Sequence, residues 1–258
     1  MRVKMTKSVR GRRGDRTRLG RTAAASCALL IVYCVTACTT SPTFTAPRES
    51  SKSVQTYATQ FPRAENPISE NGKWITGRVA GLDWADIAAR PGLAYGVESG
   101  SNGYDDSTAL LTGSWGPDQM AEATAHTVNQ SDAVYEEVEL RLRSSLSRHK
   151  ATGYEINFRC SKTSNAYAEI VRWDGPLGKF TYLKRGVGPK YGVADGDIVK
   201  AEIAGNRITA YINGIRVLQA SDNTYAIGSP GIGFYLRGAP DANRVYGFTR
   251  FTASDAPQ

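Results

Sequence analysis

The stretch Tyr135–Arg143, with the sequence YEEVELRLR, indicates the fold class of the chain. Its apolar residues Val138, Leu140 and Leu142 alternate with charged residues, so each kind falls on its own face of an extended strand. A helix would scatter the same apolar positions around its circumference. We therefore predict a β-strand with one face toward a core and a charged face pointing away from it.

The same alternation recurs along the chain, broken about every 8–12 residues by Gly, Asn, Asp or Pro, a spacing typical of an all-β sandwich or barrel. Asn213-Gly214 predicts a tight hairpin, because both central positions of a type I′ turn need a positive φ. Residues 84–90, WADIAAR, predict the one helical turn, which Pro91-Gly92 ends. Further strands are predicted at 72–78, 92–99, 107–113, 119–128, 153–161, 166–174, 179–185, 197–204, 207–213, 215–220, 231–237 and 245–253.

The net charge of +8 is concentrated at the N-terminus. Residues 1–21 contain nine Lys or Arg and one Asp, and removing them from the totals of 32 basic and 24 acidic residues leaves 23 of each. Residues 22–258 therefore have no basic excess with which to bind a phosphate backbone, and we expect no nucleic-acid partner.

The first 37 residues predict a lipoprotein signal peptide. A basic segment is followed by the mostly apolar run 22–37, which is shorter than the roughly 20 residues of a membrane-spanning helix and typical of a secretory signal. The run ends in VTAC, residues 35–38, which resembles the lipobox of bacterial lipoproteins, whose Cys receives diacylglycerol and palmitate chains. We expect acylation at Cys38, a Ser/Thr/Pro-rich tether over 38–56 and a folded domain over 57–258, anchored by lipid at the bacterial outer membrane or cell surface. The alternative is an ordinary signal peptide with a chance cysteine.

Cys160 is the one cysteine of the predicted domain, because Cys27, Cys34 and Cys38 precede it. A single thiol forms no internal disulfide, so the domain must depend on its apolar core. Since Cys160 alternates with apolar residues in the stretch 154–160, YEINFRC, we predict that it is a buried small hydrophobe.

Three segments near the C-terminus carry a resemblance to a known superfamily. Residues 196–217, GDIVKAEIAGNRITAYINGIRV, contain a strand, a Gly-Asn turn and a strand ending in Asn-Gly; GSPGIGF at 228–234 and GFTRF at 247–251 follow. They resemble the late hairpin and closing strands of concanavalin A-like lectin/glucanase domains, particularly laminin-G-like modules and the 3-keto-disaccharide hydrolase domain. The resemblance implies a jelly-roll sandwich of two antiparallel sheets, with a concave face that commonly binds glycans. It leaves the function open, because the fold hosts lectins, lyases, hydrolases and adhesion modules.

Candidate catalytic carboxylates lie in the first strand discussed. Laminarinase-type hydrolases on this fold use a strand Glu-x-Asp-x-Glu, and this sequence is similar at Glu137 and Glu139 but has Arg141 in the position of the acid/base. Glu155, on a neighbouring strand, is the third candidate. Retaining chemistry needs two carboxyls about 5–5.5 Å apart, which alternate residues of a strand approach. The alternative is a solvated outer face on which these acids pair with Arg141 and Arg143.

Candidate ligand-binding residues form a polar row on the same expected face. Arginine forks bind carboxylated sugars through two hydrogen bonds, and polysaccharide lyases of sandwich fold combine Arg and Asn with Tyr. As cross-strand ion pairs the same residues need no ligand, and that alternative stays open. The candidates are Arg141, Asn157, Arg159, Tyr235 and Arg237.

Two tryptophans are candidate sugar platforms. Trp115 and Trp173 lie at predicted strand ends beside turn residues, where an exposed ring can stack on a sugar face; the alternative is that each anchors the core. The acid pairs Asp105-Asp106 and Asp195-Gly196-Asp197 offer the oxygen ligands that Ca²⁺ prefers. Such pairs are usually turn formers, so we expect no cofactor, with calcium as the alternative.

Together these features predict a cell-envelope lipoprotein whose domain binds a glycan on its concave face. One alternative is a glycoside-acting enzyme, a hydrolase or polysaccharide lyase, resembling the 3-keto-disaccharide hydrolases. The other is an adhesion or scaffold module with a protein partner. Convergent carboxylates in a pocket favour the enzyme, exposed aromatic rings over a shallow groove favour binding alone, and a large exposed apolar patch favours the scaffold.

Overall fold

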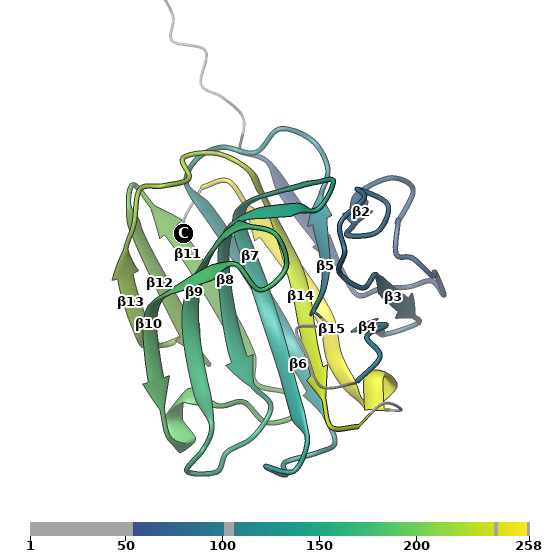
Figure 1. The fold of residues 1–258 in the computed structure, drawn as a ribbon, viewed down its shortest axis with the longest axis vertical. Coiled ribbons are helices and arrows are strands. Elements are labelled where there is room, and N and C mark those ends of the chain that lie inside the picture. The colour runs from purple at the N-terminus through teal and green to yellow at the C-terminus, as the bar shows by residue number, and fades with distance from the viewer. Residues whose placement is uncertain (1–53, 101–105, 240–241, 257–258) are drawn as a thin grey trace, which may run out of the picture. The chain divides into compact units, whose positions relative to one another are not determined.

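The computed structural model describes residues 54–100, 106–239 and 242–256, which form two antiparallel sheets packed face to face (Figure 1). This is the predicted jelly-roll sandwich. The eight-stranded sheet has the order β13-β12-β11-β6-β15-β4-β3, with β1 paired to β15, and the seven-stranded sheet the order β10-β9-β8-β7-β14-β5-β2. The predicted acylation site Cys38, and Asp105 of one predicted calcium pair, lie outside the described residues.

The strand bounds agree closely with the predicted ranges. The eight-stranded sheet consists of β1 (Thr56–Thr59), β3 (Ile87–Arg90), β4 (Leu93–Gly96), β6 (Gln119–Thr127), β11 (Ile198–Ala204), β12 (Arg207–Ile212), β13 (Ile215–Ser221) and β15 (Tyr246–Ser254). The seven-stranded sheet consists of β2 (Trp74–Thr76), β5 (Asp106–Leu111), β7 (Tyr135–Ser147), β8 (Lys150–Arg159), β9 (Tyr167–Gly175), β10 (Phe180–Val187) and β14 (Ser229–Arg237). Two short 3₁₀ helices, Pro189–Tyr191 and Ala242–Val245, lie in connections.

The core lies between the sheets and follows the alternation of the sequence. Val138, Leu140 and Leu142 of β7 are fully buried in it, as predicted. The middle inward positions of β6 are the alanines 121, 123 and 125, and on the neighbouring β15 the inward positions include the large rings of Phe248 and Phe251, so small and large residues share the space between the sheets. Burying each large apolar side chain contributes about 1.5–3 kcal/mol, which lets the domain fold without disulfides.

Two local predictions have opposite outcomes. The Asn213-Gly214 hairpin between β12 and β13 is confirmed, with φ values of 51° and 76°. The helical turn over 84–90 is wrong, because Ile87–Arg90 is strand β3, paired with β4. The three consecutive buried residues Ile87, Ala88 and Ala89 explain the error: this strand is covered on both faces and so lacks alternation.

Strand β7 contains a bulge that ends its charged row. Arg143 has a φ of 45°, and the pairing with β8 shifts between Leu142 and Ser145. A Cβ at Gly228 would overlap the backbone of Arg143, so the bulge fits only beside glycine. Arg143 was expected to share the face of Arg141, but its guanidinium instead donates to the carbonyls of Pro117, Gly205 and Tyr225.

A second apolar cluster lies on the outer face of the seven-stranded sheet. Leu82 and Trp84, from the connection between β2 and β3, pack there against Val171 and Trp173 of β9. The ring centroids of Trp84 and Trp173 are 4.4 Å apart. This cluster covers part of the outer face. Within the described residues, no helix is long and apolar enough to cross a bilayer.

Candidate functional site

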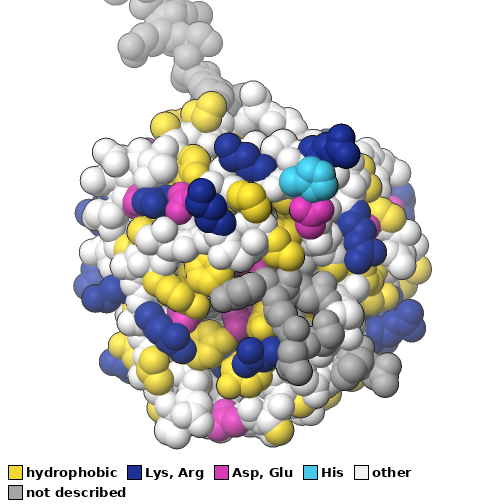
Figure 2. Space-filling view, in the orientation of Figure 1, with side chains coloured by type: hydrophobic (Ala, Val, Ile, Leu, Met, Phe, Trp, Pro, Cys, Tyr) yellow, Lys and Arg dark blue, Asp and Glu magenta, His cyan; other side chains and the backbone are white. Residues whose placement is uncertain are grey.

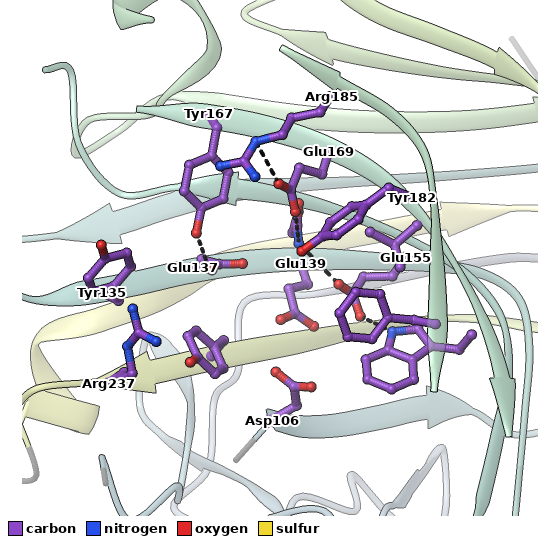
Figure 3. Close-up of a pocket in the computed structure, with 15 residues that line it drawn as sticks. Asp106, Tyr135, Glu137, Glu139, Glu155, Tyr167, Glu169, Tyr182, Arg185 and Arg237 are labelled. Carbon is purple, nitrogen blue, oxygen red and sulfur yellow. Dashed lines mark hydrogen bonds and ion pairs between the residues drawn. The ribbon is translucent and has the colours of Figure 1, made fainter. Parts of the chain in front are cut away.

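A pocket opens on the outer face of the seven-stranded sheet. Its cavity volume is about 190 Å³, and acidic and apolar side chains show in the hollow of this face in Figure 2. Strands β5, β7, β8, β9, β10 and β14 all contribute to it, as the close-up in Figure 3 shows. It is lined by Asp106, Tyr135, Glu137, Glu139, Glu155, Asn157, Tyr167, Glu169, Val171, Trp173, Phe180, Tyr182, Arg185, Tyr235 and Arg237.

The strand register brings the carboxyl groups of the pocket together. Glu139 lies opposite Asn157 of β8, which in turn lies opposite Glu169 of β9. On the other side, Tyr235 of β14 lies between Glu137 of β7 and Asp106 of β5. Since paired residues of neighbouring strands share a face, acids that are 63 positions apart at the extremes converge on one surface.

Arg141 holds two of these acids in a buried ion-pair triad. Its guanidinium lies 2.6 Å from an oxygen of Glu139 and 2.6 Å from an oxygen of Glu155, and all three side chains are buried. The indole N–H of Trp173 donates to Oε2 of Glu155, the same oxygen that contacts Arg141. A Cβ at Gly233 would overlap the Glu139 carboxylate, so glycine on β14 leaves the room that the triad occupies.

Glu137 is a buried acid of the pocket that is mostly protonated at neutral pH. Burial raises its pKa from 4.5 to about 8, although the hydrogen bond from the Tyr167 hydroxyl lowers it. Burial also raises the pKa values of Asp106 and Glu139, and the charge of Glu155 raises both further against the opposing effect of Arg141. The pocket therefore holds the protonated carboxyl of Glu137 two residues along β7 from the carboxyl of Glu139, which is paired with Arg141.

Asn157 lies at the centre of the floor. Its amide nitrogen donates to Glu155 at 3.1 Å and to Glu169 at 3.3 Å. Its Oδ1 is buried and accepts no hydrogen bond within the described residues. A buried acceptor of this kind is suited to a hydroxyl donated by a ligand.

Aromatic rings form the walls. At one end, Trp173 packs on Phe180, with ring centroids 5.0 Å apart, and Phe180 packs in turn on Tyr182. The ring of Tyr182 is 52% exposed at the pocket rim. At the opposite end, the ring of Tyr135 lies between two guanidinium groups, with Arg237 4.2 Å and Arg159 4.3 Å from its centroid.

The structure brings most of the predicted site residues together. All three candidate carboxylates, Glu137, Glu139 and Glu155, line the pocket, with Asn157, Tyr235, Arg237 and Trp173. Arg141 lies at its edge under the ring of Trp84, and Arg159 lies behind Tyr135, donating to the backbone carbonyls of Val134 and Glu136. The alternative of a solvated acidic face is wrong about solvation, because these carboxylates are buried, but its expected pairing with Arg141 is confirmed for Glu139 and Glu155.

The prediction of exposed tryptophan platforms is wrong for both rings. Trp115 is 8% exposed and belongs to the core between the sheets, where its N–H donates to the carbonyl of Thr112. Trp173 is 3% exposed and forms a wall inside the pocket. Both tryptophans pack inward although they lie beside turn residues. Burying a large aromatic ring against apolar neighbours is more favourable than leaving it exposed at a loop rim.

Several lining residues were missed by the sequence analysis. Glu169, Tyr167 and Tyr182 belong to strands that were predicted correctly, and Asp106 was considered only as a calcium ligand. Once the strands are paired, alternation alone places Glu169 on the face of Asn157. The covering Trp84 carried no such signal, since its place depends on the path of a connection.

The predicted calcium acids have other partners. Asp195 contacts the ring of His126 at 2.7 Å, and Asp197 pairs with Lys162 at 2.8 Å. In the described part of the chain no cluster of three or more His, Cys, Asp or Glu residues is arranged to hold a metal ion.

No protein-family model matches the sequence, and no curated protein is significantly similar to it. Solved structures do match. The carbohydrate recognition domain of Emp46p, in its metal-free form, has a TM-score of 0.51 at 11% identity, covering 78% of this chain and 97% of that one. The carbohydrate-binding module CBM66 from Bacillus subtilis has a TM-score of 0.48 at 19% identity, covering 66% and 95%. The κ-carrageenase of Zobellia galactanivorans has a TM-score of 0.47 at 11% identity, covering 81% and 98%. The Emp46p match shows the shared β-sandwich fold.

Proposed function

We propose that the protein binds a glycan by inserting one sugar ring into the pocket on the seven-stranded sheet. The observation that supports this proposal is that buried carboxylates and Asn157 converge between aromatic walls. Sugar hydroxyls both donate and accept hydrogen bonds, so they can satisfy carboxylate acceptors and an amide together. The apolar face of the ring can pack on Tyr182 or Phe180.

The size of the cavity limits what enters it. Pockets that bind drug-sized ligands usually have volumes of about 300–1,000 Å³. A cavity of about 190 Å³ is smaller, so we expect it to take a single ring while the remainder of the glycan lies outside. The solved domain with the TM-score of 0.51 is itself a carbohydrate recognition domain, which is compatible with this proposal.

A glycan-array screen followed by calorimetry tests the binding site. We expect Tyr182→Ala and Asn157→Ala each to weaken binding of a selective glycan about tenfold, because each removes one stacking or hydrogen-bonding group. The matched control is Tyr211→Ala, which removes a partly buried tyrosine from β12 of the other sheet and should leave the affinity unchanged. A blank array, or a ligand that is insensitive to both pocket variants, would count against glycan binding here.

A second candidate function is catalysis on the bound glycoside. The specific observation is that Glu137, with a pKa of about 8, carries a proton at neutral pH two residues from Glu139 on the same face. Glycoside hydrolysis needs such a proton donor beside a second carboxyl. Product analysis on any glycan that binds separates the two functions: turnover that Glu137→Gln abolishes while binding persists indicates an enzyme.

We further propose that Cys38 is acylated and holds the domain at the bacterial cell envelope through the tether 38–56. The support is the lipobox-like VTAC at 35–38 after a basic and an apolar segment. More than one acyl chain gives stable anchoring, since each buried CH₂ contributes about 0.8 kcal/mol. In a bacterial host, metabolic labelling with a palmitate analogue should mark the protein in the membrane fraction, and Cys38→Ala should abolish the label. Equal labelling of the unaltered protein and of Cys38→Ala would mean that the acyl chain is attached to another residue.

A further inference from the structure

The arginines around the pocket differ in their acidic partners. Arg141 contacts Glu139 and Glu155, and Arg185 lies 3.0 Å from Glu169. Arg237 also lines the pocket, but within the described residues no carboxylate lies within ion-pair distance of it. The guanidinium of Arg237 stacks on the ring of Tyr135.

Stacking fixes Arg237 in a position from which it can bind. The Tyr135 ring is held from its other side by Arg159, whose guanidinium is buried and donates to the backbone. A guanidinium stacked on a ring keeps the N–H groups in its own plane available, in the fork that matches a carboxylate or a sulfate. Two guanidinium groups on one ring also place cationic charge at this end of the pocket, where it can attract an anion.

The charges of the pocket are therefore separated along the strands. Arg237 lies opposite Tyr135 at the beginning of β7, and the next pocket-facing position along β7 is Glu137. Glu137 is protonated at neutral pH, so it neither competes for Arg237 nor repels an anion beside it. Glu139 and Glu155, which contact Arg141, lie farther along β7 and β8, toward Trp84.

From this arrangement we propose that Arg237 is an oxyanion subsite beside the sugar pocket. The ligand class is an acidic glycan in which an uncharged ring occupies the carboxylate-lined floor and a carboxylate or sulfate on the adjoining unit binds Arg237. This proposal rests on the proposed glycan binding and adds the charge of the ligand to it. A neutral ligand makes no ion pair with Arg237. A ligand that places its anionic group among the glutamates of the pocket floor lies beside acidic groups instead of beside a cation.

Paired ligands test the subsite. Uronate-containing and sulfated oligosaccharides are compared with their carboxyl-reduced and desulfated counterparts by calorimetry, which also distinguishes the two sources of the anion. We expect at least one acidic ligand to bind about tenfold more tightly than its neutral counterpart, the effect of one charge-assisted pair. Arg237→Gln should bring that ratio close to one while keeping the affinity for the neutral counterpart. Raising the salt concentration should reduce the ratio for the unaltered protein.

The matched control is Arg216→Gln, which removes an exposed arginine from β13 of the other sheet and should preserve the ratio. Thermal unfolding of both variants shows whether they fold. Equal affinity for acidic and neutral ligands, or a preference that survives Arg237→Gln, would overturn the subsite while leaving glycan binding intact. An absence of binding by every oligosaccharide, acidic or neutral, would overturn the proposed function and the subsite with it.

Discussion

Arg141→Met is expected to lower the free energy of unfolding by about 3–5 kcal/mol at neutral pH, the usual cost of removing one partner from a buried ion pair. The substitution leaves Glu139 and Glu155 buried without the cation that lies 2.6 Å from each. Methionine keeps much of the apolar contact with the Trp84 ring, so the loss reports mainly on charge. Urea unfolding followed by tryptophan fluorescence measures it.

Two further variants identify the cause. Combining Arg141→Met with Glu139→Gln and Glu155→Gln should recover most of the lost stability, because no unpaired charge then remains buried. Arg185→Met is the matched control: its ion pair with Glu169 has an arginine side chain that is 49% exposed, so we expect a loss of at most about 1 kcal/mol. If the triple variant is no more stable than Arg141→Met, the triad matters through its packing rather than through its charge.

Glu137→Gln is expected to make the protein more stable above pH 5, by an amount that grows with pH. The folded state holds the proton of Glu137 up to a pKa of about 8, whereas the unfolded chain releases it near 4.5. The folded state therefore binds more protons between these values, and its stability falls with rising pH by roughly 1.4 kcal/mol per unit. The stabilisation that Glu137 gives the folded state by holding its proton is fully present below about pH 4.5. About 5 kcal/mol of this stabilisation is lost by pH 8.

The difference in the free energy of unfolding between Glu137→Gln and the unaltered protein reports the ionisation of Glu137 alone. Glutamine retains an acceptor for the Tyr167 hydroxyl but does not titrate. Unfolding curves at half-unit steps from pH 4.5 to 9 should show a difference that increases up to about pH 8 and is constant beyond it. A difference that stays the same at every pH would mean that Glu137 ionises normally in the folded protein.

Much of the fold could be predicted because period-two alternation is a local signal. Of the two strands that were missed, Ile87–Arg90 is buried on both faces, and Thr56–Thr59 was assigned in part to the tether. Neither shows a clear alternation of apolar and charged residues. Their placement depends on pairing with β4 and β15, partners that lie elsewhere in the sequence.

The candidate site was predicted as a face but not as a pocket. Alternation placed Glu137, Glu139 and Asn157 together, because their strands are neighbours. It could not show that these acids are buried, since their cover comes from Trp84 in a distant connection and from the outer strand β10. It also misplaced Arg143, because a bulge reverses the facing of every later residue in the strand.

The buried thiol of Cys160 offers a way to follow events in the pocket. It is 2% exposed, and burial raises its pKa, so a thiol reagent reaches a reactive thiolate only when the sheet opens. A ligand that binds only the closed form lowers the open population by the factor one plus its concentration over the dissociation constant. The alkylation rate of the peptide that contains Cys160, measured by mass spectrometry, therefore reports the occupancy of the pocket and needs no modified ligand. A thiol in the core of the domain thus becomes a probe with which to search for the ligand.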